Sequence, residues 1–273
     1  MIIGFAMQVA VMMLGAFIVQ AIHAPQTSPL YVLKALIICA LTLVTHYLFN
    51  RYVDDSPHND LSLPGAGREF LGGYGTGFVI FTVIVAVVWL MGGYAMGKMN
   101  DWNTIWLMLA SVSLAPGVTE EIIFRGLFFR FVERMGGTWI ALIASALLFG
   151  LAHFGNPNAG LVPAIAIAIE AGLLLGAVYL LTRQLWAAIG LHAAWNFTQG
   201  WIFGIPVSGT NDPGLVVSVR EGPEWLTGGA FGLEASMVAL VIATLAGIWI
   251  ARMAYQRGRF IAMPKWGQKL PLN

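Results

Sequence analysis

The sequence has very little charge, since Lys, Arg, Asp and Glu together make up 10% of its 273 residues. Soluble domains carry about 25% charged residues, whereas 58% of this chain is hydrophobic. Polar side chains are too few to cover a globular surface in water, so much of the surface must face lipid. The net charge of only +1 also argues against nucleic-acid binding, which needs a strongly basic face.

Cysteine is nearly absent, and the chain begins without a basic residue. Cys39 stands alone, which excludes an intrachain disulfide, and no Cys/His cluster has zinc-finger spacing. No Lys or Arg precedes the apolar run at 1–22. A cleaved signal peptide has a basic start and a shorter apolar core, so we expect this run to be a retained membrane span.

Long apolar runs dominate what is present, and a helix needs about 20 apolar residues to cross the bilayer. Eight runs qualify: 2–22, 30–49, 74–96, 104–133, 138–154, 161–181, 185–203 and 233–255. Pro116 followed by Gly117 predicts a break or kink in the fourth run, and Gly136 predicts its end. Segments 50–73 and 204–230 are polar and rich in Gly and Pro, so we expect loops there. The sequence thus predicts an all-α polytopic transmembrane bundle of about eight spans with a broken or kinked fourth span.

Basic residues are distributed unevenly between the two sides of this bundle. With eight spans, eleven of the fourteen Lys and Arg residues fall on the side of both termini. Lys98 and Arg220 fall on the other side, and Lys34 lies within a span. Cytoplasmic segments hold the excess of Lys and Arg. We therefore expect a multi-pass protein of the cell membrane with both termini in the cytoplasm.

Three charges interrupt the apolar stretch VTEEIIFRGLFF. A charge within a span costs at least about 2.5–3.5 kcal/mol and persists when it is paired or functional. Glu121 precedes Arg125 by four residues, which is the favourable order for an ion pair on one helix face. Glu120 points about 100° away from that face, so it needs another partner or a chemical role. Alternatively, Thr119 caps a helix that starts after the break, and both carboxylates lie at its N-terminus, where the dipole favours negative charge.

Two further patterns place residues four apart on one helix face: Phe149 and His153 in FGLAH, and His192 and Asn196 in HAAWN. A lone His in a span is usually a hydrogen-bonded packing residue. However, a rise of about 1.5 Å per residue puts Glu120, both histidines and Asn196 near the middle of the bilayer, where they can meet.

A carboxylate, two imidazoles and a carboxamide form a hydrolytic set. The carboxylate takes a proton from water, one imidazole orients that water, and the second imidazole and the amide donate to a developing oxyanion. If the site instead binds a divalent metal, Glu120, His153 and His192 are its ligands. No HExxH motif is present, which excludes a zincin, and Ser208 lies in a loop without a paired base.

Two features lie outside these patterns. Glu170, midway along 161–181, either pairs with a polar group in the cavity or shapes substrate entry. Gly172 and Gly176 form a GxxxG pattern, which predicts close packing on a neighbouring helix or a dimer face.

The patterns EExxxR, FxxxH and HxxxN, in this order on successive spans, resemble the CPBP family (Abi, or CAAX protease and bacteriocin-processing), to which type II CAAX prenyl endopeptidases belong. The likeness covers about residues 110–240 and is specific because three motifs occur in order with matched spacing. It implies an intramembrane glutamate-dependent endopeptidase in a single membrane domain, 1–273. The catalytic core then spans about 104–255, and the N-terminal spans cover about 2–96.

The resemblance also assigns roles to the motif residues. It implies Glu120 as the general base, His153 as the group that positions water, and His192 with Asn196 as the oxyanion site. The remaining motif residues, which support these four, are Glu121, Arg125 and Phe149.

Two other functions fit the same residues. Intramembrane Glu, His and Arg also mark proton- or ion-coupled transporters, although no inverted repeat is visible. A non-catalytic membrane scaffold or immunity protein is the third alternative. For the protease, we expect a hydrophobic or lipid-anchored peptide as substrate, with no certain cofactor and a divalent metal ion as the open possibility.

Overall fold

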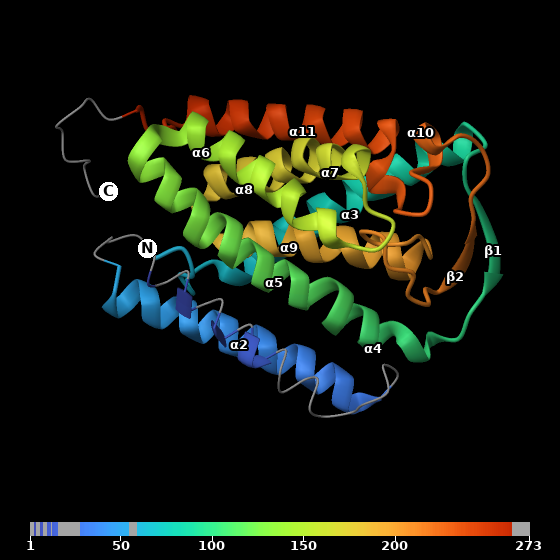
Figure 1. Ribbon diagram of the computed structural model, residues 1–273, viewed down its shortest axis with the longest axis horizontal. Coiled ribbons are helices and arrows are strands. Elements are labelled where there is room, and N and C mark those ends of the chain that lie inside the picture. The colour runs from blue at the N-terminus through green and yellow to red at the C-terminus, as the bar shows by residue number, and fades with distance from the viewer. Residues whose placement is uncertain are drawn as a thin grey trace.

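The computed structural model describes residues 28–54 and 59–263, together with a few residues among the first 15 (Figure 1). The predicted span at 2–22 therefore lies largely outside the described residues. The helices are α2 (Pro29–Tyr52), α3 (Ala66–Leu90), α4 (Ile105–Leu107), α5 (Ala115–Glu121), α6 (Arg130–Ala152), α7 (Leu161–Ile167), α8 (Leu173–Thr182), α9 (Leu185–Phe197), α10 (Glu224–Thr227) and α11 (Met237–Gln256). This arrangement confirms the prediction of a helical bundle.

Five helical stretches of the described chain are long and apolar enough to cross a membrane: Pro29–Tyr52, Ala66–Leu90, Trp102–Gly155, Leu161–Thr182 and Met237–Gln256. The third has 54 residues and bends at Gly137, whose backbone is left-handed with φ 79°. A helix of that length is about 80 Å long if straight, so the bend produces two limbs close to the predicted 104–133 and 138–154. The count of eight spans stays a prediction.

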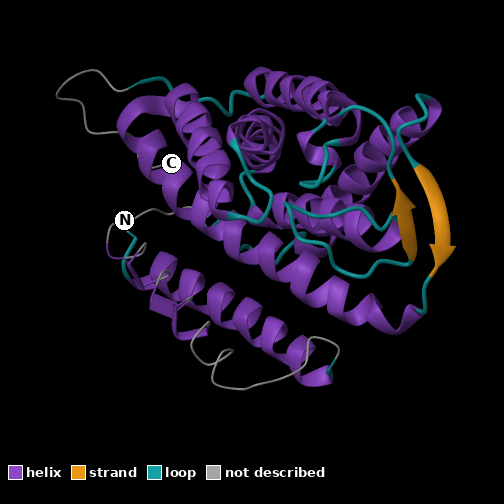
Figure 2. Cartoon of the chain, turned by 45° about the vertical axis from the view of Figure 1, so that its right-hand side comes forward, coloured by secondary structure: helices purple, strands orange, loops and turns teal. Residues whose placement is uncertain are grey.

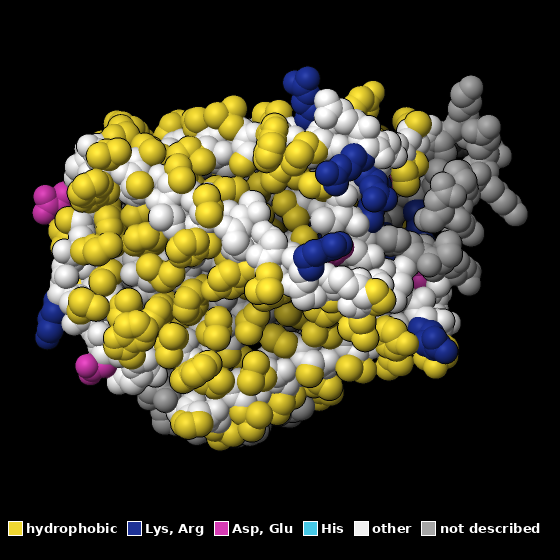
Figure 3. Space-filling model, turned by 180° about the vertical axis from the view of Figure 1, so that it is seen from behind, with side chains coloured by type: hydrophobic (Ala, Val, Ile, Leu, Met, Phe, Trp, Pro, Cys, Tyr) yellow, Lys and Arg dark blue, Asp and Glu magenta, His cyan; other side chains and the backbone are white. Residues whose placement is uncertain are grey.

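The outer surface of these helices is apolar over its middle. Figure 3 shows hydrophobic side chains across one broad face, with most Lys and Arg side chains gathered towards one end. Leu, Ile, Val and Phe side chains are exposed along α2, α3, α6 and α11. A surface of this kind is stable against lipid and would aggregate in water.

The helix continues through Pro116, so of the two predicted outcomes there, a break or a kink, the break does not occur. Turns of the wider π type, Met108–Leu114 and Ile122–Phe129, lie on either side of α5, and the backbone between them stays helical. Such turns change the hydrogen-bond register and let a helix continue through a proline. Thr119 is therefore not an N-cap, because its hydroxyl donates to the carbonyl of Ala115 at 2.7 Å.

Helix α3 begins at Ala66, inside the segment expected to be a loop, and ends at Leu90. Two of its glycines, Gly73 and Gly77, let the backbone of α9 approach closely. A Cβ on Gly73 would collide with the carbonyl of Ala187, and one on Gly77 would stand 2.5 Å from the carbonyl oxygen of Leu191. Glycine in this segment therefore indicates close helix packing rather than a loop.

The segments that follow α3 and α9 form a small antiparallel sheet at one end of the bundle (Figure 2). Strands β1 (Ala95–Met99) and β2 (Val216–Val219) pair in it, with Ala95 opposite Val219. The sequence placed 95–96 in a span and 216–219 in a loop, so it missed this sheet.

Helix α9 forms the centre of the bundle, since eleven of its thirteen residues are buried. It packs against α3, α5 and α8. Gly172 and Gly176 lie against the limb of α6 that follows Gly137, because a Cβ on either would stand 2.7 Å from Ala146 or Leu142. The close-packing interpretation of GxxxG is thus confirmed within the chain, and these glycines do not form a free dimer face.

Candidate active site

Glu121, Arg125 and His192 form a buried chain of charge-assisted contacts. The Nη1 of Arg125 donates to Oε1 of Glu121 at 2.8 Å, and both side chains are 0% exposed, as the spacing predicts. The same oxygen lies 2.9 Å from Nδ1 of His192 on α9. Because the carboxylate accepts there, Nδ1 carries the proton and Nε2 points away from Glu121.

Arg125 is held by two further contacts. Its guanidinium lies 4.5 Å from the ring centroid of Phe149, and its Nη2 reaches the carbonyl of Gly172 at 3.3 Å. The ring of Phe149 in turn contacts both histidine rings, with centroids 4.7 Å from His153 and 6.0 Å from His192. Phe149 therefore packs one cation and two imidazoles into a fixed arrangement.

His153 directly follows α6 and is held by that helix. Its Nδ1 lies 2.8 Å from the carbonyl oxygen of Phe149, four residues earlier. A carbonyl only accepts, so Nδ1 is the donor and Nε2 faces the site without that proton. Both histidines are thus fixed through Nδ1, and both present Nε2.

Glu120 lies where these two nitrogens converge. Its Oε2 is 3.8 Å from Nε2 of His153 and 3.9 Å from Nε2 of His192. That oxygen is buried and has no hydrogen-bond partner among the described residues, although 28% of the Glu120 side chain is exposed. The spacing leaves room for a water molecule at hydrogen-bond distance, about 2.8 Å, from the carboxylate and an imidazole.

Asn196 reaches the same site from one turn further along α9, and Pro116 explains how it is held. Because proline has no N–H, residue 116 makes no helical bond to the carbonyl of Val112 four residues earlier. This carbonyl accepts Nδ2 of Asn196 at 2.9 Å. An amide nitrogen has two N–H donors, so one remains available to a substrate oxygen.

The four predicted residues open onto a pocket of about 370 Å³. Tyr31 of α2, Leu107 of α4 and the loop residues Val207, Ser208 and Thr210 form its other walls. This volume accommodates several residues of an extended or partly apolar chain. The structure therefore brings Glu120, His153, His192 and Asn196 together at the base of a pocket large enough for a peptide; their catalytic roles stay a prediction.

The donor atoms do not fit a metal ion well. Tetrahedral ligands about 2.0–2.1 Å from zinc stand roughly 3.3–3.4 Å from one another, which is less than the 3.8 and 3.9 Å between Glu120 and the two histidines. In the described part of the chain, no group of three or more His, Cys, Asp or Glu side chains is arranged to hold a metal. A metal on Glu120, His153 and His192 remains an untested expectation.

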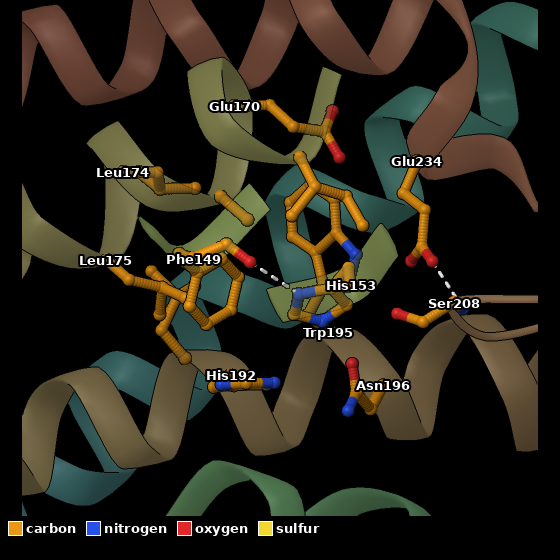
Figure 4. Close-up of a pocket in the computed structure, with 13 residues that line it drawn as sticks. Phe149, His153, Glu170, Leu174, Leu175, His192, Trp195, Asn196, Ser208 and Glu234 are labelled. Carbon is orange, nitrogen blue, oxygen red and sulfur yellow. Dashed lines mark hydrogen bonds between the residues drawn. The ribbon is translucent and has the colours of Figure 1, made fainter. Parts of the chain in front are cut away.

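Two acidic residues that the motifs do not explain lie behind the histidines (Figure 4). Glu170 and Glu234 line a second, smaller cavity together with Trp195. Burial raises the pKa of Glu234 to about 7, although a hydrogen bond from the backbone N–H of Ser208 favours its ionised form. The only sequence signal for Glu170 and Glu234 was that each is an acidic residue within or beside a span. This signal predicted no partner for either residue.

Residues 101–198 match the family model described as Type II CAAX prenyl endopeptidase Rce1-like. All seven motif residues, from Glu120 to Asn196, fall within this segment, and the resemblance to that family is confirmed. Neither the curated proteins nor the solved structures compared with the chain gave a match. The matched segment and the long apolar helices together identify a membrane protein with a domain of a CAAX-type protease family.

Proposed function

We propose, from the CAAX-protease domain at residues 101–198, that this chain is a membrane-embedded endopeptidase whose Glu120 activates water. One observation carries the proposal. The buried Oε2 of Glu120 lacks a hydrogen-bond partner among the described residues, and it faces the Nε2 atoms of His153 and His192 at 3.8 and 3.9 Å. A water molecule bound at that point would donate a hydrogen bond to the carboxylate oxygen. Its contacts with the imidazoles would fix its orientation.

In the proposed reaction, Glu120 takes one proton from a water molecule that also donates to Nε2 of His153. The resulting hydroxide adds to the carbonyl carbon of the scissile peptide bond and generates an oxyanion. The free N–H of Asn196 donates to this oxyanion, and His192 does so from Nε2 when it is doubly protonated. Glu120 then passes its proton to the leaving amine, and the C–N bond breaks. The proposed mechanism uses no metal ion.

Glu121 and Arg125 have a positioning role in this proposal. The ion pair with Arg125 fixes the carboxylate of Glu121, whose Oε1 accepts a hydrogen bond from Nδ1 of His192. A carboxylate behind an imidazole fixes its orientation and stabilises its protonated form. The orientation of His192 therefore depends on an ion pair that is itself buried.

The substrate that we propose is a hydrophobic or lipid-anchored peptide. The pocket lies among apolar helices and is lined by Tyr31, Leu107 and Val207 as well as by the polar site. The matched family acts on prenylated peptides, which supports a lipid-bearing substrate.

Comparative analysis of peptide termini tests the proposal. Membranes from cells that make the wild-type protein should contain new termini that are missing with Glu120→Gln. Glu224→Gln is the matched control, since Glu224 is exposed on α10 and lines neither pocket. Identical termini in wild-type and Glu120→Gln membranes would refute the proposal. Proton or ion flux through reconstituted vesicles, without new termini, would favour a transporter, and binding of a partner that survives loss of all four site residues would favour a scaffold.

A further inference from the structure

A small cavity of about 30 Å³ lies behind the two histidines. His153, His192, Asn196 and Ser208 line both this inner cavity and the outer pocket. The four side chains therefore form the wall between them, and Figure 4 shows the inner side of that wall. A molecule bound in the inner cavity is separated by one side chain from the position between Oε2 of Glu120 and Nε2 of His153.

Glu170 is the most unusual group in this cavity. It lies on the π-type turn Ala168–Gly172 in the middle of a span, and its side chain is 0% exposed. Neither of its carboxyl oxygens has a hydrogen-bond partner among the described residues. A buried carboxyl group without a hydrogen-bond partner is unfavourable even when it is uncharged. Figure 4 shows the carboxyl group turned towards the cavity that Trp195 and Glu234 also line.

Glu234 provides a second carboxyl group from a different element. It lies on the single turn Leu233–Ala235 before α11, is 3% exposed, and accepts the backbone N–H of Ser208. Most of the remaining lining is apolar, with Ile167, Leu174 and Leu175 contributing. Two carboxyl groups thus stand on an otherwise largely apolar wall, and the two oxygens of Glu170, which have no partner among the described residues, can be satisfied there by small polar molecules.

Water fits this cavity by volume and by chemistry. A water molecule needs about 10–15 Å³ of such volume and two to four polar partners, so the cavity holds roughly two. The carboxyl oxygens of Glu170 and Glu234 can accept hydrogen bonds from water, and the rings of His153 and His192 border the cavity on its other side. A larger organic ligand does not fit into 30 Å³.

We propose that Glu170 and Glu234 hold a water store that refills the hydrolytic position from behind. Each peptide bond cleaved consumes one water, whose oxygen and one hydrogen enter the new carboxyl terminus and whose other hydrogen enters the new amine. A peptide that fills the outer pocket blocks the direct route from bulk solvent, and the surrounding helices face lipid. The inner cavity is then the nearest source of the next water molecule. This inference rests on the proposed function for its role in turnover, but the water site itself does not.

Hydroxyl-radical labelling by pulsed X-rays tests the water site without any substrate. Radicals form at bound water, so a buried residue beside a water store is oxidised faster than an equally buried residue elsewhere. Trp195 lines the cavity and is 6% exposed, whereas Trp201 is 5% exposed and does not line it. We expect Trp195 to be labelled several-fold faster than Trp201 in the wild type. The difference should vanish in Glu170→Leu and persist in Glu170→Gln, which still binds water.

Two results would overturn the water site: equal labelling of both tryptophans in the wild type, or unchanged labelling in Glu170→Leu. Equal labelling of Trp201 in all variants shows that the fold is intact. Glu224→Leu, on the exposed α10, is the matched control and should behave as the wild type.

Peptide cleavage by the same proteins tests the supply role. Glu170→Leu should lower kcat several-fold with little change in KM, and Glu170→Gln should restore most of kcat. Wild-type kcat in a Glu170→Leu protein that has lost the Trp195 labelling would overturn the supply role and leave the proposed protease intact. A wild-type protein that cleaves nothing would refute the protease, while the labelling would still decide the water site.

Discussion

At the scale of single residues, the site depends on one oxygen that two side chains share. Oε1 of Glu121 contacts both Arg125 and Nδ1 of His192, at 2.8 and 2.9 Å. The spacing of four residues was enough to predict the ion pair. It could not predict the contact with His192, because that contact depends on how α5 and α9 are rotated against each other. The alternative, a Thr119 cap, is wrong because the helix continues through Pro116.

Removing Arg125 should be costly. Arg125→Met leaves Glu121 as a buried charge with only His192 to compensate it, and loss of one partner of a buried pair costs about 3–5 kcal/mol. Unfolding in detergent micelles measures this cost. The double variant Glu121→Gln/Arg125→Met should recover much of the stability, since no unpaired charge remains, but not the cleavage activity. A loss below about 1 kcal/mol in Arg125→Met would show that the pair does not stabilise the fold.

Glu234 should make stability depend on pH. Burial raises its pKa from 4.5 to about 7 in the folded protein. Between these values the unfolded chain is ionised while the folded one keeps its proton, so stability falls as pH rises through this window, by up to about 3 kcal/mol. Unfolding of the wild type at pH 5 and pH 8 should show the fall, and Glu234→Gln should show a smaller one. Equal falls in both proteins would mean that Glu234 does not titrate in this window.

At the scale of elements, Pro116 connects the irregular helix to the site. The apolar runs predicted most helices, and Gly136 predicted the bend to within one residue of Gly137. The sequence contains no pattern that indicates the π-type turns, since a proline is equally compatible with a break. It also gave no sign that the carbonyl of Val112 would hold Asn196, which lies 84 residues further along the chain.

Pro116→Ala should weaken catalysis rather than folding. Alanine restores an N–H that can bond to the carbonyl of Val112 and compete with Nδ2 of Asn196. Loss of one hydrogen bond is worth about 0.5–1.5 kcal/mol, which corresponds to roughly a 2- to 12-fold fall in kcat. Steady-state cleavage and detergent unfolding measure the two effects. A protein with unchanged kcat would show that this carbonyl does not position Asn196.

At the scale of the whole molecule, buried ion pairs tie together the basic end of the bundle. Arg130 contacts Asp54, which follows α2, at 2.6 Å, and Arg183, which follows α8, contacts Glu133 of α6 at 2.6 Å. His46 lies 3.1 Å from Asp60 in the same region. The two arginine pairs join residues that lie 76 and 50 positions apart, and no local pattern reveals them.

The predicted orientation can be tested with single cysteines, because the native Cys39 is buried. Lys98 on β1 and Arg257 after α11 are both exposed. If the excess of basic residues marks the cytoplasmic side, a membrane-impermeant maleimide should label Lys98→Cys in intact cells. It should label Arg257→Cys only after the membrane is opened. The opposite pattern would invert the topology.

Cleavage by purified protein in lipid vesicles tests the central claim most directly, with a peptide that spans a cleavage site found in cell membranes as substrate. General-base catalysis contributes about 10²–10⁴-fold, so Glu120→Gln should lose at least about 100-fold in kcat while Glu224→Gln keeps the wild-type rate. A Glu120→Gln protein that cleaves as fast as the wild type would contradict the claim that this carboxylate activates the water.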